Sequence, residues 1–120
     1  MKKMLLALTL FGLVGCGMTP NEIREKPTQS FISNKTQDQV VECLVSHLDE
    51  RTFNGVRSNT VTKPIHNGVS LSPLAGNFEF IDITREEQGV KVIYYGEGTV
   101  RPLMPDTRKN EVIEDINSCL

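Results

Sequence analysis

The chain has 120 residues, with 13 basic and 15 acidic side chains, a formal net charge of −2, three cysteines and no tryptophan. This length allows one small domain, in which a hydrophobic core alone is marginal and a covalent crosslink helps. The chain contains no cluster of basic residues, which argues against nucleic-acid binding and against a polybasic grip on anionic lipid.

The first predicted element is a secretory signal peptide at residues 1–15. Lys2 and Lys3 form a short cationic tip, and residues 4–14 are apolar apart from Thr9. This run is too short for a membrane span, which needs about 20 apolar residues, but it fits the roughly 7 to 15 residues of a signal sequence. Loss of the two lysines would leave 11 basic against 15 acidic residues, a net charge of −4.

The motif Leu13-Val14-Gly15-Cys16 ends this apolar run. It resembles the lipobox of bacterial lipoproteins. The resemblance implies that the Cys16 thiol receives a diacylglyceryl group, that the chain is cut before Cys16, and that a further acyl chain such as palmitate is added to the new amino group. Two or three acyl chains hold a protein stably on a membrane. The alternative is an ordinary secreted protein in which the cysteine occurs by chance.

The residue after Cys16 bears on the destination. Gly17 stands where an aspartate would resemble the inner-membrane retention signal. The resemblance therefore implies an outer-membrane lipoprotein that faces the periplasm, with display at the cell surface as the alternative.

Residues 16–35 are predicted to form the lipidated cysteine and a flexible tether. Pro20, Pro27, alternating charges and few apolar residues are typical of a segment that does not fold alone. As a flexible coil, residues 17–35 would reach ~24 Å on average. Phe31 and Ile32 are apolar enough to dock onto the domain.

The globular domain is predicted at residues 36–120 and begins with a helix at residues 36–51. Thr36 and Gln39 have the spacing of a capping box, and apolar residues follow at helical intervals. Asn-Gly at residues 54–55 is expected to end this helix.

Three strands are predicted next. Residues 56–65 are weakly patterned, and Pro64 argues against a central strand there. Alternation predicts a short strand at 69–72, and residues 77–84 and 90–96 form a hairpin whose five-residue connection ends in glycine. Both hairpin strands are apolar on both faces. One face must therefore meet helices, and the other is covered by the tether or loops or binds a partner.

A last helix is predicted at residues 107–119, after Pro102 and Pro105. The expected fold is α+β: a small three-stranded antiparallel sheet with two helices on one face, in the order α-β-β-β-α, stapled by a disulfide.

Cys43 and Cys119 are predicted to form that disulfide, because a pair of cysteines in a small exported domain is typically oxidised and the lipobox resemblance implies that the Cys16 sulfur is alkylated. Closing this loop stabilises the fold by roughly 4 kcal/mol. Two free thiols are the alternative, and redox activity is disfavoured because C-x-x-C spacing is absent. A metal site of Cys43, His47 and His66 would require reduced Cys43, so it excludes the disulfide.

Catalytic residues, a metal and a cofactor are not predicted. Strand alternation puts Glu79 and Asp82 on opposite faces, where we interpret them as solvated charges. Ser70 lacks a nucleophile-elbow pattern, and the GxG at residues 96–98 precedes no helix. The aromatic residues of the hairpin form sheet core or, alternatively, an exposed stripe for a partner's strand or a sugar. These candidate partner contacts are Phe78, Phe80, Tyr94 and Tyr95.

The sequence therefore predicts an outer-membrane-anchored lipoprotein that acts as a non-enzymatic interaction or accessory module. Its partners would be the membrane, through the lipid, and an envelope protein. The order of helix, three strands and helix, with a cysteine pair near the ends, resembles small uncharacterised envelope lipoproteins. One alternative is a prophage- or plasmid-type lipoprotein that blocks phage infection or conjugation. Another is an inhibitor of an envelope enzyme.

Overall fold

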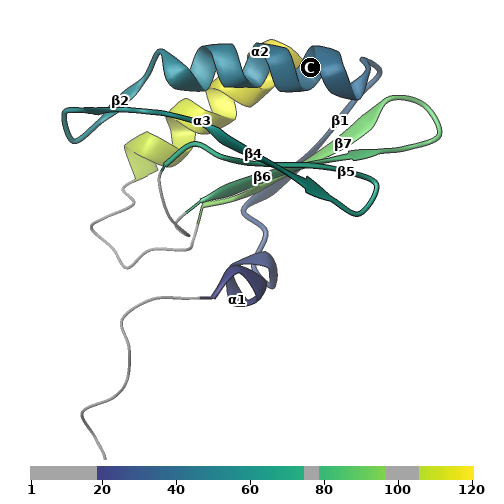
Figure 1. The fold of residues 1–120 in the computed structure, drawn as a ribbon, viewed down its shortest axis with the longest axis horizontal. Helices are drawn as coiled ribbons and strands as arrows, with labels where there is room; N and C mark the ends of the chain where they lie inside the picture. Colours follow the sequence, from purple (N-terminus) through teal and green to yellow (C-terminus); the bar gives the residue numbers. More distant parts are fainter. Residues whose placement is uncertain (1–18, 75–78, 97–105) are drawn as a thin grey trace, which may run out of the picture.

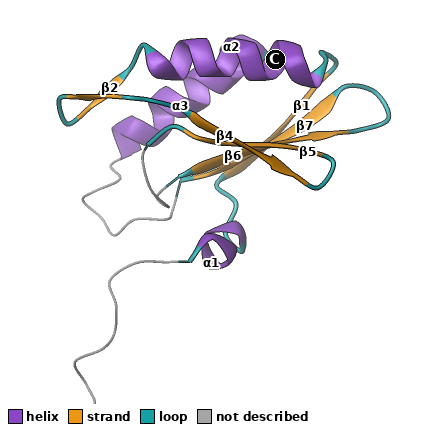
Figure 2. Ribbon diagram, viewed as in Figure 1, coloured by secondary structure: helices purple, strands orange, loops and turns teal. Residues whose placement is uncertain are grey.

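The computed structural model describes residues 19–74, 79–96 and 106–120. Within them, a five-stranded antiparallel sheet in the order β1-β7-β6-β5-β4 has two long helices on one face and a short helix on the other (Figures 1 and 2). The helices are α1 (Pro20–Arg24), α2 (Gln37–Asp49) and α3 (Asp106–Cys119). The strands are β1 (Gln29–Ser33), β4 (Val61–Ile65), β5 (Gly68–Ser72), β6 (Phe80–Arg85) and β7 (Val90–Tyr95), and β2 (Thr52–Phe53) and β3 (Val56–Arg57) form a separate hairpin.

The α+β class, the two long helices and the antiparallel hairpin are confirmed, but the sheet has five described strands and not three. The two additional strands are the edges, β1 and β4. In β4, Pro64 pairs with Val69 of β5. Proline is tolerated there because an edge strand leaves one row of N–H groups outside the ladder, so the prediction was right to exclude a central strand and missed an edge strand.

The prediction of a flexible tether is wrong from Thr19 onward. Thr19 caps α1, and β1 pairs along its whole length with β7, with Phe31 opposite Val92. Phe31 and Ser33 point into the core whereas their neighbours are exposed. This alternation of buried and exposed side chains is typical of a β-strand. It places Phe31 in the core and so holds the segment in the sheet, although its composition resembles that of a coil.

The start of α2 is confirmed in detail. The Thr36 hydroxyl accepts a hydrogen bond from the Gln39 N–H, and the Gln39 side chain accepts one from the Thr36 N–H. The helix ends at Asp49. Asn54 and Gly55, expected to stop the helix, have positive φ and form the turn between β2 and β3, as Asn-Gly commonly does in two-residue hairpins.

The sheet has an inner face, which packs against α2 and α3, and an outer face, which carries α1. The inner face and the two helices form the main core, whose buried residues include Leu44, Ile81, Val92 and Ile116. On the outer face, Ile23 of α1 packs in a second cluster with Phe80 and Tyr95 of the sheet. This second cluster explains why β6 and β7 are apolar on both faces.

Candidate functional site

The predicted disulfide is present. Cys43 of α2 and Cys119 of α3 are bonded, with their Cα atoms 5.7 Å apart. The bond ties the two helices together over the inner face. Cys16, the predicted lipidation site, and Phe78 lie outside the described residues.

Cys43, His47 and Cys119 bring their ligand atoms within 4.8 Å of one another, as a metal site would require. In the oxidised protein both sulfurs are bonded to each other, so this group offers only the imidazole of His47. A zinc site needs three or four protein ligands. His66, the third predicted ligand, lies in the turn between β4 and β5, outside this group.

The described aromatic residues proposed as partner contacts are buried. Phe80 and Tyr95 face outward from the sheet but lie beneath α1, with exposed fractions of 6% and 7%. Tyr94 lies fully buried on the inner face. A partner cannot reach Phe80 and Tyr95 while α1 stays in place, and Tyr94 lies in the core beneath α2 and α3.

Glu79 is the centre of a buried polar cluster on the inner face, which corrects its interpretation as a solvated charge. Its Oε2 accepts a hydrogen bond of 2.6 Å from the Tyr94 hydroxyl, and its Oε1 accepts one of 2.7 Å from Nη2 of Arg108. The Arg108 guanidinium also lies 5.7 Å from the ring centroid of Phe53. Both charged side chains are essentially inaccessible to solvent.

Asp82 is likewise buried, but on the outer face. Its two oxygens accept hydrogen bonds of 2.9 and 3.2 Å from Arg24 of α1, which also donates to the Ser70 hydroxyl. The hydrogen bond to Asp82 is the main cause that raises the pKa of the Arg24 guanidinium above its usual value. The Arg24 guanidinium stacks 4.7 Å from the centroid of Phe80. The prediction that Glu79 and Asp82 lie on opposite faces is confirmed.

A third arginine–carboxylate pair joins the end of α2 to α3. Arg51 donates hydrogen bonds of 2.8 and 2.9 Å to the two oxygens of Asp115, and this contact is the main cause that raises the arginine's pKa. In all three pairs an arginine side chain donates to the oxygens of a buried carboxylate. Carboxylates held in this way stabilise the fold, and they do not converge on a common pocket.

The two edges of the sheet differ in their protection. Edge strands expose unpaired backbone groups, and proline and lysine commonly guard them against pairing with another chain. β4 contains both Lys63 and Pro64, whereas β1, with the sequence QSFIS, contains no proline and no charge. Three of its five residues are exposed. β1 is therefore an unguarded edge.

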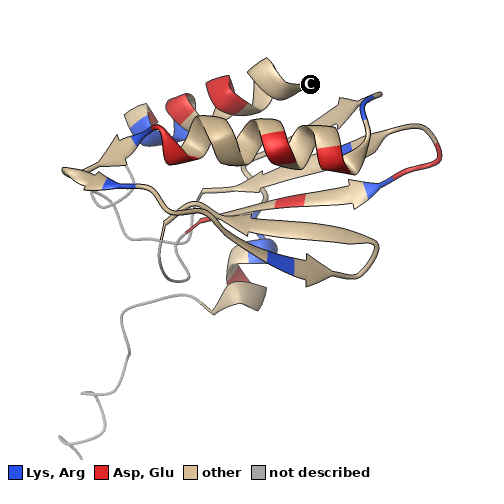
Figure 3. Cartoon of the chain, turned by 45° about the horizontal axis from the view of Figure 1, so that its top comes forward, with Lys and Arg blue, Asp and Glu red and all other residues tan. Residues whose placement is uncertain are grey.

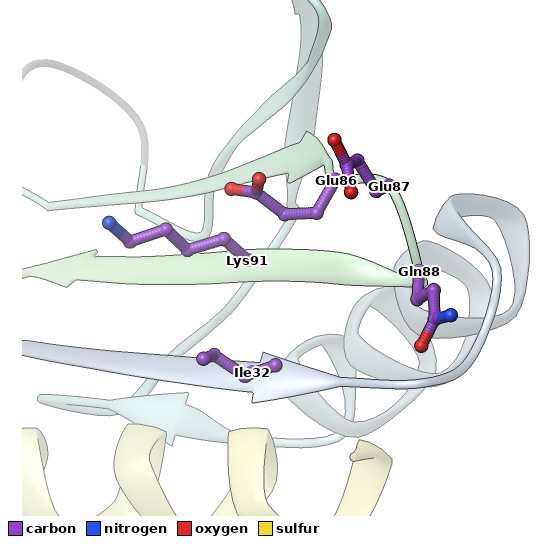
Figure 4. Close-up of a pocket in the computed structure, with 5 residues that line it drawn as sticks. All are labelled: Ile32, Glu86, Glu87, Gln88 and Lys91. Atoms are coloured by element: carbon purple, nitrogen blue, oxygen red, sulfur yellow. The ribbon is translucent and has the colours of Figure 1, made fainter.

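An open depression of about 540 Å³ lies on the outer face next to β1 (Figure 4). Ile32 of β1 and Lys91 of the neighbouring strand β7 line this depression. Glu86, Glu87 and Gln88 come from the turn between β6 and β7. The depression thus combines one exposed apolar side chain with a polar rim of two glutamates, a glutamine and a lysine.

Comparisons of the chain with protein-family models, with curated proteins and with solved structures gave no match. Among the described residues, none of the helices combines the length and the apolar character that a membrane crossing requires.

Proposed function

We propose that this chain is a lipid-anchored bacterial envelope protein that acts by binding another envelope protein and not by catalysis. The lipobox-like motif ending in Cys16 supports the anchor, on the periplasmic side of the outer membrane. The Cys43–Cys119 bond supports residence in an oxidising compartment, because disulfides are rare where thiols are kept reduced.

The observation that carries the binding role is the unguarded edge of β1. An extended segment of a partner can add to such an edge through main-chain hydrogen bonds and continue the sheet. The acidic turn at Glu86 and Glu87, close to β1, favours a partner segment with a lysine or arginine nearby. The arginine pairing of the buried carboxylates supports a binding role over an acid–base role.

The anchor is tested with Cys16→Ser in the full-length chain. Without the thiol no diacylglyceryl group can be attached, so we expect the protein to leave the membrane fraction or to keep its signal segment. Mass spectrometry and fractionation of labelled cells measure both. Continued incorporation of labelled fatty acid by Cys16→Ser would contradict the proposal.

The binding edge is tested by photocrosslinking in intact cells. A photoreactive residue replaces Gln29 on β1 in one variant and Thr62 on β4 in the other. Both are exposed edge positions on the inner-face side of their strands. We expect a discrete crosslinked partner from position 29 and little from position 62. Equal capture from both positions, or none from position 29 in a folded protein, would refute β1 as the site.

A further inference from the structure

The disulfide between α2 and α3 lies beside a third side chain of a type that ligates metals. His47 follows Cys43 by about one helical turn, so both lie on the same side of α2. Cys119, the last residue of α3, completes the group, and the three ligand atoms lie within 4.8 Å of one another. Two sulfurs and an imidazole nitrogen are a ligand set that favours zinc.

The spacing of this group is close to that of a zinc site once the disulfide is reduced. Zinc binds thiolate sulfur at about 2.3 Å and imidazole nitrogen at about 2.0 to 2.1 Å. Tetrahedral angles then separate the two sulfurs by ~3.8 Å and each sulfur from the nitrogen by ~3.6 Å. Both sulfurs already lie within 4.8 Å of the nitrogen. Because reduction lets the sulfurs move apart, rotations of the three side chains can form the site.

Other contacts hold the two helices together besides the disulfide. Leu44 and Leu48 of α2 and Val112 and Ile116 of α3 are fully buried in the main core. The pair of Arg51 and Asp115 adds a polar link at the end of α2. Reduction therefore removes one of several connections, and the core still favours the placement of α2 beside α3.

Charge and exposure favour a cation at this place. The side chain of His47 is 44% exposed, so the fourth zinc position would be open to water. Oδ1 of Asp115 lies 4.0 Å from Nδ1 of His47, and carboxylates beside a ligating imidazole commonly orient its ring. α2 carries three acidic residues and no lysine or arginine (Figure 3). Acidic surroundings of this kind raise the local concentration of cations.

We propose that Cys43, His47 and Cys119 form a zinc site that is available only when the two cysteines are reduced. Reduction of the disulfide adds two electrons and two protons, which a dithiol supplies as it becomes a disulfide. Zn²⁺ then displaces the two thiol protons, and water takes the fourth position. A newly made chain has both thiols reduced, so zinc competes with oxidation at that stage. The site requires neither the lipid anchor nor the β1 edge.

The test measures zinc affinity on the purified full-length chain, after reduction with a phosphine that is then removed. A chromophoric zinc chelator competes for the metal, and circular dichroism follows the fold. His47→Gln removes the imidazole and keeps both cysteines. His66→Gln is the matched control, because His66 is also exposed but lies in the turn between β4 and β5, outside the group.

We expect the reduced chain to bind zinc and the oxidised chain to bind none. His47→Gln should weaken zinc binding by about tenfold or more, since even changes next to the ligands commonly have an effect of this size. His66→Gln should leave the affinity unchanged. Cobalt in place of zinc should give thiolate-to-metal charge-transfer bands and the ligand-field absorption of a tetrahedral site.

Equal zinc affinity of His47→Gln and His66→Gln would overturn the site, because it would place the metal on the thiolates without the imidazole. Zinc binding by the oxidised chain would overturn it as well. So would a reduced chain that stays unfolded in the presence of zinc.

Alkylation followed by mass spectrometry gives a second measurement, resolved for Cys43 and Cys119 separately. Zinc-bound sulfurs are withheld from a thiol probe, so zinc should slow the labelling of both cysteines severalfold in the reduced chain. This protection should be lost in His47→Gln and kept in His66→Gln. Labelling at an unchanged rate in the presence of bound zinc would show that the metal lies elsewhere.

Discussion

At the scale of single residues, the buried pair of Arg108 and Glu79 has the largest expected effect on stability. Arg108 is 1% exposed, and its Nε and Nη1 have no hydrogen-bond partner among the described residues. Its bond to Glu79 and its place above Phe53 offset the desolvation of the guanidinium. Removing one member of such a pair costs more than the pair contributes, because the other charge stays buried alone.

We therefore expect Arg108→Met to lower the free energy of unfolding by about 3 to 5 kcal/mol, as measured by urea denaturation. The double variant Glu79→Gln/Arg108→Met should be less destabilised than Arg108→Met alone, since it leaves no uncompensated charge. A double variant at least as unstable as the single one would show that packing, and not charge, is the reason for the loss.

Tyr95 gives the fold a dependence on alkaline pH. Burial, and next the charge of Asp82, raise the pKa of its hydroxyl above the usual 10.0, although Arg24 opposes the rise. The folded state thus binds this proton more tightly than the unfolded chain. Its stabilising contribution is complete below the unfolded pKa and is lost as the pH rises through the folded pKa.

We expect the free energy of unfolding to decline above about pH 10, and to decline less in Tyr95→Phe, which keeps the ring that packs against Ile23. Urea unfolding at a series of pH values measures the difference. Parallel curves for the two proteins would mean that other groups, and not Tyr95, cause the alkaline loss.

At the scale of elements, the disulfide connects α2 and α3 across a sequence separation of 76 residues. Both helices also contribute to one core, and Arg51, two residues after α2 ends, pairs with Asp115 of α3. A crosslink over a loop of this length stabilises mainly by restricting the unfolded chain.

Replacing both cysteines, in Cys43→Ala/Cys119→Ala, should lower the free energy of unfolding by about 4 kcal/mol. In the native protein neither thiol should react with a thiol probe until a reductant is added. Labelling of the folded, unreduced protein at either position would contradict the bond, and a loss well below 1 kcal/mol would show that the helix packing alone holds the two elements.

The elements that escaped prediction are those whose stability comes from distant partners. β1 has one strongly apolar inward residue, Phe31, and it is held by β7. α1 has five residues and depends on Arg24 reaching Asp82. The pattern of residues within a short segment does not reveal that the segment pairs with residues far along the chain. In α3, by contrast, a signal was present: Arg108 stands one turn before Val112, on the helix face that is buried.

At the scale of the whole molecule, the sequence predicted the central strands and the two long helices, but it did not predict the edge strands or α1. The two long helices, the β6–β7 hairpin, β5 and the disulfide were predictable because each has a local periodicity, a capping box or a cysteine pair. The open edge at β1 was not predictable, since it exists only once β1 has joined the sheet. The burial of Phe80 and Tyr95 depended on α1 in the same way.

The packing of α1 on the outer face also affects when the N-terminal segment can fold during synthesis and export. Arg24 is made 58 residues before Asp82, and Cys43 is made 76 residues before Cys119. Contacts between such distant residues form slowly, because the loop between them must close first. The N-terminal segment therefore has nothing to pack against until much of the chain has emerged. In an exported chain, this delay would leave the thiol of Cys16 accessible to an acylating enzyme throughout translocation, before folding brings the domain close to it.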